Sequence, residues 1–144
     1  MLLTNFKNLI SGILLNRNCN VVRVAGNTIT LTPSEIVGSD GLLNCGYMWI
    51  GTGNEDVKDD DYTFNFDNTS FTNSNQSTNI LADRIVYNAS FTNISTSDLV
   101  VTNVGVSVHD TSWAKQFFVE ITKLDTPITI KAGETKTFTI TINF

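Results

Sequence analysis

The densest group of chemically active side chains in this sequence is an acidic run between residues 54 and 61, with five carboxylates in seven residues. Calcium takes about six to eight oxygen ligands, often from a flexible loop, so the run is a candidate calcium site. Its order differs from that of an EF-hand loop, and the turn glycine of that loop is missing. A solvated acidic loop is the favoured interpretation. The candidate ligands are Glu55, Asp56, Asp59, Asp60 and Asp61.

Catalytic patterns are weak elsewhere in the chain. Glycoside hydrolysis needs two carboxylates at a set separation, and any acidic chain supplies such pairs. Nucleophilic catalysis needs a base beside Ser or Cys, but His109 is the only histidine and lies in the turn-like sequence HDTS. Gly51-Thr52-Gly53 lacks the Lys-Ser/Thr of a phosphate-binding loop. We therefore expect a protein that is not an enzyme and that uses no cofactor.

The two cysteines, Cys19 and Cys45, permit one disulfide without implying it. Two unpaired, partly buried thiols are the favoured interpretation, because free cysteines are often simply buried. Neither cysteine has a second ligand at metal-binding spacing.

Four aromatic residues can be interpreted in two ways. A row of exposed rings can stack on sugars, whereas aromatic residues at every second position more often belong to a core. The core interpretation is favoured. The alternative hypothesis, a carbohydrate-binding or receptor-binding sandwich, requires exposed Trp49 or Trp113. The four residues are Trp49, Tyr62, Phe64 and Trp113.

The composition favours strands and argues against nucleic acid as a partner. About a quarter of the 144 residues are Thr or Asn, well above the usual share. Thr packs well on a pleated sheet and Asn favours turns. The net charge is −5, and the nine basic residues are scattered, so a phosphate-binding surface is not expected.

Alternation of apolar and polar residues predicts most of the elements. Residues 21–25 and 28–32 flank Gly26-Asn27 and are expected to form a hairpin. In the strand predicted over residues 99–108, Asn103 and Gly105 indicate a bulge or a close backbone approach. Loops are expected over residues 33–42 and 67–79, the latter alternatively as the tip of a long hairpin. The other predicted strands are residues 47–50, 62–66, 84–93 and 113–124. The last of these also fits a helix through Trp113, Phe117 and Ile121, but its β propensity favours a strand.

The last twenty residues carry the clearest pattern. Phe138, Ile140, Ile142 and Phe144 alternate with Thr and Asn, and Ile128 and Ile130 alternate upstream. With a turn over residues 132–134, these two runs predict a terminal hairpin with one face buried. The whole is expected to be one mostly β domain: an antiparallel β-sandwich, Ig-like or jelly-roll-like, of about eight strands with a short N-terminal amphipathic helix.

That helix is predicted over residues 4–15, with Thr4 or Asn5 as its cap. Residues 1–18 are expected to form a helical segment and residues 19–144 the sandwich. The segment lacks the positive start and cleavage site of a secretion signal, and no membrane span is expected. The helix either packs on its own sandwich or docks on a neighbouring subunit. Its partner-binding candidates are Phe6, Leu9, Ile10, Ile13 and Leu14.

Three segments resemble parts of small β-sandwich structural proteins of tailed bacteriophages. In MWIGTGNEDVKDDDYTF, a strand, a Gly-Thr-Gly turn, a polar loop and Asp-Tyr follow one another. SFTNISTSDLVVTNVGVSV resembles their unit of strand, Asn-containing turn, strand and Gly. LDTPITIKAGETKTFTITINF resembles their terminal hairpin. The matching positions are Leu3, Thr4, Asn5, Phe6, Ile50, Gly51, Thr52, Gly53, Asp61, Tyr62, Phe91, Thr92, Asn93, Gly105, Pro127, Gly133 and Glu134.

The resemblance implies an accessory virion protein, either an auxiliary or decorating subunit of the capsid or a subunit of the tail or collar. Its partners would be other virion proteins or further copies of itself, with neither nucleic acid nor a membrane as a partner. It would be located in the virion after assembly in the cytoplasm of the host bacterium.

Overall fold

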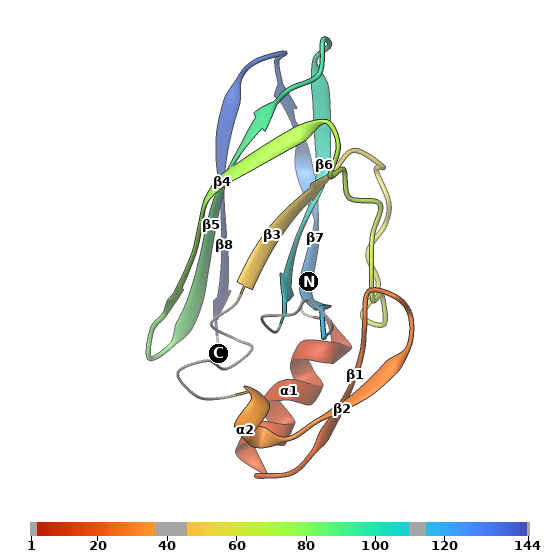
Figure 1. Ribbon diagram of the computed structural model, residues 1–144, viewed down its shortest axis with the longest axis vertical. Coiled ribbons are helices and arrows are strands. Elements are labelled where there is room, and N and C mark those ends of the chain that lie inside the picture. Colours follow the sequence, from red (N-terminus) through yellow and green to blue (C-terminus); the bar gives the residue numbers. More distant parts are fainter. Residues whose placement is uncertain (1–2, 37–45, 110–114, 144) are drawn as a thin grey trace.

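Two three-stranded antiparallel sheets face each other and enclose the main hydrophobic core (Figure 1). The computed structural model describes residues 3–36, 46–109 and 115–143. This architecture confirms the predicted mostly β antiparallel sandwich with a short N-terminal helix. One sheet has the order β3 (Gly46–Gly51), β6 (Leu99–Val108), β7 (Phe117–Ile130), and the other has the order β4 (Phe71–Ile80), β5 (Arg84–Asn93), β8 (Thr135–Asn143).

A smaller unit lies at one end of the sandwich (Figure 1). Helix α1 (Thr4–Leu14) packs against a ribbon of β1 (Cys19–Val22) and β2 (Thr28–Leu31). These two strands form the predicted hairpin, and Gly26 adopts φ 85° in its turn, a conformation open to glycine at no steric cost.

A second short helix, α2 (Pro33–Ile36), occupies the start of the stretch predicted to be a loop. Residues 37–42 of that prediction lie outside the described residues. The backbone N–H of Thr32 donates to Oε2 of Glu35 at 2.8 Å, as in a capping box, and Pro33 supplies a preset φ at the first helical position. Lys115 also pairs with Glu35, and these contacts lower the pKa of Glu35 to about 2.

The sheet β4-β5-β8 has one wet face, which explains its Thr-rich alternation. Along β8, Phe138 and Ile142 are buried, whereas Thr137, Thr139 and Thr141 are exposed. On that wet face, hydroxyl groups pair across strands, for example Ser90 with Thr137 at 2.8 Å. A period of two therefore predicts both the strand and its buried face correctly.

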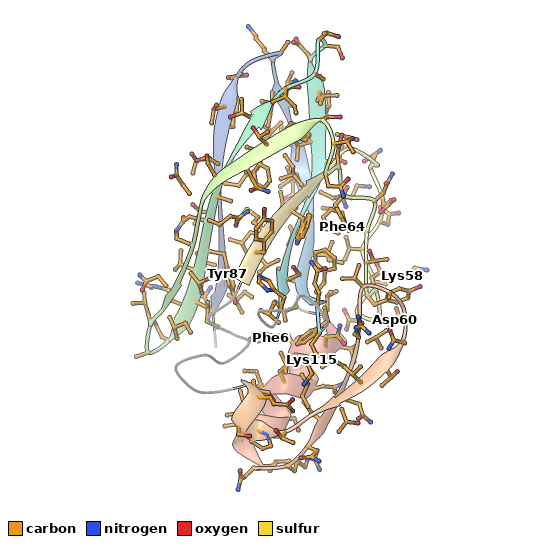
Figure 2. The ribbon with its side chains drawn as sticks, viewed as in Figure 1. Phe6, Lys58, Asp60, Phe64, Tyr87 and Lys115 are labelled. Atoms are coloured by element: carbon orange, nitrogen blue, oxygen red, sulfur yellow. The ribbon has the colours of Figure 1, made fainter. Side chains whose placement is uncertain are left out.

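The sheet β3-β6-β7 is buried on both faces instead. All residues from Val101 to Val108 of β6 are buried, because the loop over residues 52–66 covers the outer face of this sheet. Phe64 packs there against Phe118, with ring centroids 5.3 Å apart (Figure 2). A β-carbon on Gly105 would lie 2.6 Å from the Phe64 ring, so the predicted close approach at Gly105 is confirmed. The bulge predicted near Asn103 is also confirmed, as a register shift between Val101 and Asn103.

The strand predicted over residues 62–66 is wrong. Only Phe66 forms an isolated bridge, to Gly51, and the N–H of Phe66 donates to the carbonyl of Phe64 in a tight turn. The alternation arises because Phe64 and Phe66 pack onto the outer face of the sheet while Asn65 between them is exposed. Side chains can therefore alternate between buried and exposed positions in a segment whose backbone does not pair with another strand.

The predicted terminal hairpin is also wrong, although both of its strands exist. β7 pairs with β6, and β8 pairs with β5 in the other sheet. The connection over residues 131–134 carries the chain between sheets and is held by Asn93 at the end of β5. The N–H of Gly133 donates to the carbonyl of Asn93, and the N–H of Asn93 donates to the carbonyl of Glu134. β8 thus returns beside β5, as the fourth strand of a Greek key does.

The loop predicted over residues 67–79 is wrong from residue 71 onward, because β4 occupies residues 71–80 and pairs with β5. A bulge between Ser74 and Ser77 interrupts this pairing, and Asn75 adopts φ 53° there. The bulge presents the amide of Gln76 to β3. Gln76 accepts from the N–H of Met48 at 3.0 Å and donates to its carbonyl at 3.1 Å. One side chain thus joins the edges of the two sheets.

Gln76→Ala should lower the free energy of unfolding by about 1–3 kcal/mol, because it leaves both backbone groups of the buried Met48 without this partner. Urea unfolding measures the effect. Asn79→Ala, at an exposed site on the same strand, is the control and should change stability by less than about 0.5 kcal/mol. Equal effects of the two substitutions would contradict the proposed role of Gln76.

Candidate interaction surface

Most carboxylates of the acidic run bond to partners within the same chain. Asp59 pairs with Lys7 of α1 at 2.8 Å, and its carbonyl accepts from the N–H of Thr4 at 2.8 Å. Asp56 pairs with Lys123 of β7 at 2.7 Å, which lowers the pKa of Asp56. These contacts hold the loop against both the sheet and the start of the helix.

Two further carboxylates of the run accept hydrogen bonds from different backbone N–H groups. Oε2 of Glu55 accepts from the N–H of Asn65 at 2.9 Å, and Oδ2 of Asp61 accepts from the N–H of Lys58 at 2.7 Å. Asp60 lies on the same loop beyond Lys58 (Figure 2). In the described part of the chain, no three His, Cys, Asp or Glu side chains gather around a possible metal position. The candidate calcium ligands for which bonds are given thus face different partners in this structure.

The three candidate aromatic residues that the structure describes do not assemble into one exposed platform. Trp49 is half-buried, its Nε1 donates to Oγ of Ser107 at 2.8 Å, and its ring packs 4.7 Å from that of Phe66. Phe64 is buried beneath the loop, whereas Tyr62 is exposed and lies near Gly26. Trp113 lies outside the described residues. The favoured core interpretation holds for Phe64, and Trp49 serves mainly to pack the loop.

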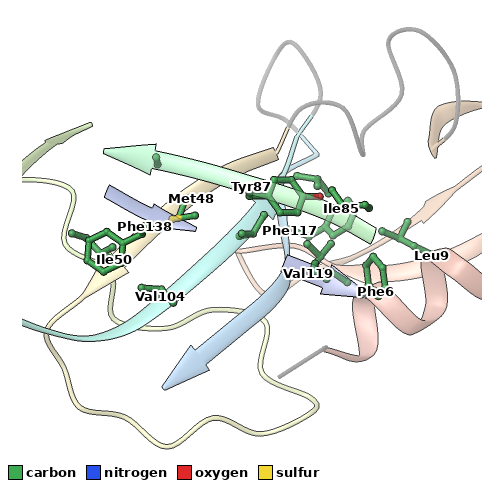
Figure 3. Packing of buried hydrophobic residues seen from close by; sticks show 14 of the residues in the cluster. Phe6, Leu9, Met48, Ile50, Ile85, Tyr87, Val104, Phe117, Val119 and Phe138 are labelled. Carbon is green, nitrogen blue, oxygen red and sulfur yellow. The ribbon is translucent and has the colours of Figure 1, made fainter. Parts of the chain in front are cut away.

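The amphipathic helix divides its apolar residues between the core and the surface. Phe6 and Leu9 project toward Val119 and Ile85 within the main core (Figure 3). Leu9 is fully buried and Phe6 is 3% exposed, so both side chains pack mainly on the chain's own sandwich. Ile10 and Ile13 are half-buried at the edge of the core, and Leu14 is 77% exposed.

The exposed part of the helix borders an open groove of about 490 Å³ between α1 and the end of β8. Leu15, which the sequence patterns did not single out, extends the groove and is 60% exposed. The sequence could have indicated Leu15, because it is the last residue of the predicted helix and continues the apolar run of Ile13 and Leu14. The lining residues are Phe6, Lys7, Ile10, Ser11, Leu14, Leu15 and Asn143.

Asn5 fixes the orientation of this helix and therefore of the groove. Its Nδ2 donates to the carbonyls of Val22 at 2.8 Å and Phe118 at 3.1 Å, and its Oδ1 accepts from the N–H of Val22 at 2.8 Å. The buried amide thus joins α1, β1 and β7. Asn5 was predicted as a helix cap, but Leu3 precedes the first turn as the N-cap residue.

A second hollow, of about 310 Å³, lies where the helix meets β1 and is lined mostly by polar groups beside Cys19. Cys19 is a free thiol, and burial raises its pKa. Cys45 lies outside the described residues.

No family model, no curated protein and no solved structure matches this chain. Neither helix in the described ranges is long and apolar enough to cross a membrane. The surface geometry is therefore interpreted from the residues themselves.

Addition of calcium should leave the thermal unfolding midpoint unchanged, because the five carboxylates face different partners. Scanning calorimetry with calcium and with a chelator makes the comparison. A midpoint that rises and saturates with calcium concentration would contradict this expectation, since a cation that binds only the folded state must stabilise it.

Asn5→Ala should destabilise the fold by at least about 2 kcal/mol, because it leaves buried backbone groups of two strands without partners. Asn8→Ala is the matched control on the same helix, since Asn8 makes a single exposed bond, to the carbonyl of Asn20. Chemical unfolding distinguishes them. A loss for Asn5→Ala no greater than for Asn8→Ala would refute the anchoring role.

Proposed function

We propose that this protein is an accessory structural subunit of a tailed-bacteriophage virion and that it acts through protein–protein contacts. It would either decorate or reinforce the capsid or form part of the tail or collar. It would not act as an enzyme, and it would reach the virion by assembly in the host cytoplasm.

The observation that carries this proposal is the apolar groove beside α1. Leu14 and Leu15 are large apolar side chains exposed next to each other, and Ile10 continues the apolar surface toward the core. Contiguous exposed apolar residues rimmed by polar groups are typical of protein-binding sites. An amphipathic helix that keeps part of its apolar face exposed can bury that part against a neighbouring subunit.

The chemistry of the acidic loop is consistent with a structural role. Its carboxylates bind Lys7, Lys123 and backbone amides within the same chain, so they stabilise the outer layer of the sheet. The resemblance of three segments to small phage structural proteins supports the same conclusion and supplies the virion context.

Mass spectrometry of purified virions, from the phage whose genome encodes this chain, tests the proposal. The protein should be present at a fixed ratio to the major virion proteins after stringent washing. Its absence from intact particles would overturn the proposed function.

Leu14→Gln should lower incorporation into virions several-fold, because it places a polar amide in the groove while keeping a good helix former in α1. Ile94→Gln is the control: Ile94 is 56% exposed in the connection between β5 and β6, away from the groove. Quantitative mass spectrometry compares the two. Equal incorporation would exclude the groove as the docking surface without removing the proposed virion role.

A further inference from the structure

The free edges of the two sheets are protected unequally. The edges of β3 and β4 are joined through Gln76, as described above. The start of β7 is covered by backbone donors: the N–H of Leu3 bonds to the carbonyl of Val119, and the N–H of Val24 to that of Gln116, just before the strand. Further along, β7 contains Lys123, Asp125 and Pro127. Charges and proline on an edge strand discourage further strand pairing.

β8 has fewer of these protections, because no described backbone donor covers its outer edge. It pairs with β5 over nine residues without a register shift, from Thr135 to Asn143. It contains no proline, and Lys136 is its one charged residue. Within the described ranges, no segment pairs with its other side. At such an edge every second residue turns its N–H and C=O groups away from the sheet, where they can pair with another strand.

We propose that β8 pairs antiparallel with β8 of a second copy of this chain, around a two-fold axis at Thr139. The two sheets β4-β5-β8 would then join into one continuous six-stranded sheet. This inference goes beyond the proposed function, because it concerns contact between copies and does not depend on what fills the groove beside α1.

The sequence of β8 is self-complementary about this axis. Thr139 would face Thr139 of the partner, and Thr137 would face the partner's Thr141, so hydroxyl residues meet on the wet face. The existing sheet already pairs hydroxyls in this way, for example Thr92 with Thr135 at 2.7 Å. On the buried face, Phe138 would meet the partner's Ile140. An isologous contact of this kind closes as a dimer.

The charges of the strand also allow the pairing. Lys136 would face the partner's Ile142, so the single charge of β8 never meets its own copy. Like charges placed directly opposite each other destabilise a strand pair, whereas this register avoids them. We propose a second copy of this chain as the binding partner because the sequence of β8 is complementary to itself in this register.

Thr139→Lys tests the proposal, because it places two lysines opposite each other at the axis. Thr72→Lys is the matched control: Thr72 is exposed on the same wet face but on β4, at the far edge of the sheet. In analytical ultracentrifugation, the wild type and Thr72→Lys should show a concentration-dependent dimer. Thr139→Lys should weaken that dimer at least about tenfold.

Cysteine cross-linking gives a second test, which remains informative even if Thr139→Lys folds poorly. Thr139→Cys should form an oxidised dimer well above the wild-type background, and Thr72→Cys should not, because only position 139 meets its own copy. A wild type that stays monomeric at about 1 mM would overturn the proposal. So would equal effects of the two lysines, or equal cross-linking at positions 139 and 72.

Discussion

Burial of the sheet β3-β6-β7 on both faces is the constraint on which the rest of this structure depends. One face forms the sandwich core with the opposite sheet, and the other would expose Phe118 and Ile121 if the loop over residues 52–66 did not cover it. The loop must therefore stay in place, which is what its bonds to Lys7, Lys123 and Thr4 achieve. The same loop connects the sheet to α1, so the position of the surface groove depends on it.

The periodicity of the sequence predicted strands where side chains alternate between core and water. β5 and β6 have the predicted bounds, and β8 has the predicted alternation. Alternation cannot predict which strands pair with each other, because it specifies the buried face of a strand and not its neighbour in the sheet. The sequence therefore predicts that β8 pairs with β7. In the structure, the connection held by Asn93 places β8 beside β5 instead. The polar strand β4 gave no apolar pattern, since most of its residues face solvent at an edge.

The surface site was predicted in part. Helical periodicity identified the apolar residues of α1, but it could not tell that Phe6 and Leu9 face the chain's own core while Leu14 faces outward. The pattern Thr-Pro-Ser-Glu before Ile36 carries a capping-box signal and could have predicted α2. The bridge made by Gln76 could not be foreseen, because it depends on a bulge in one sheet that meets the edge of another.

The docking of α1 has a consequence for synthesis on the ribosome. Asn5 bonds to Phe118, a partner 113 positions later in the chain, and Leu3 packs against Ile121. Translation proceeds at about 5–20 residues per second, so Phe118 is synthesised roughly 6–23 s after Asn5. During that interval only β1 and β2 can cover its apolar face, and the part that packs on β7 stays without its native partner. An early segment that completes its packing last is exposed to chaperones and to neighbouring nascent chains.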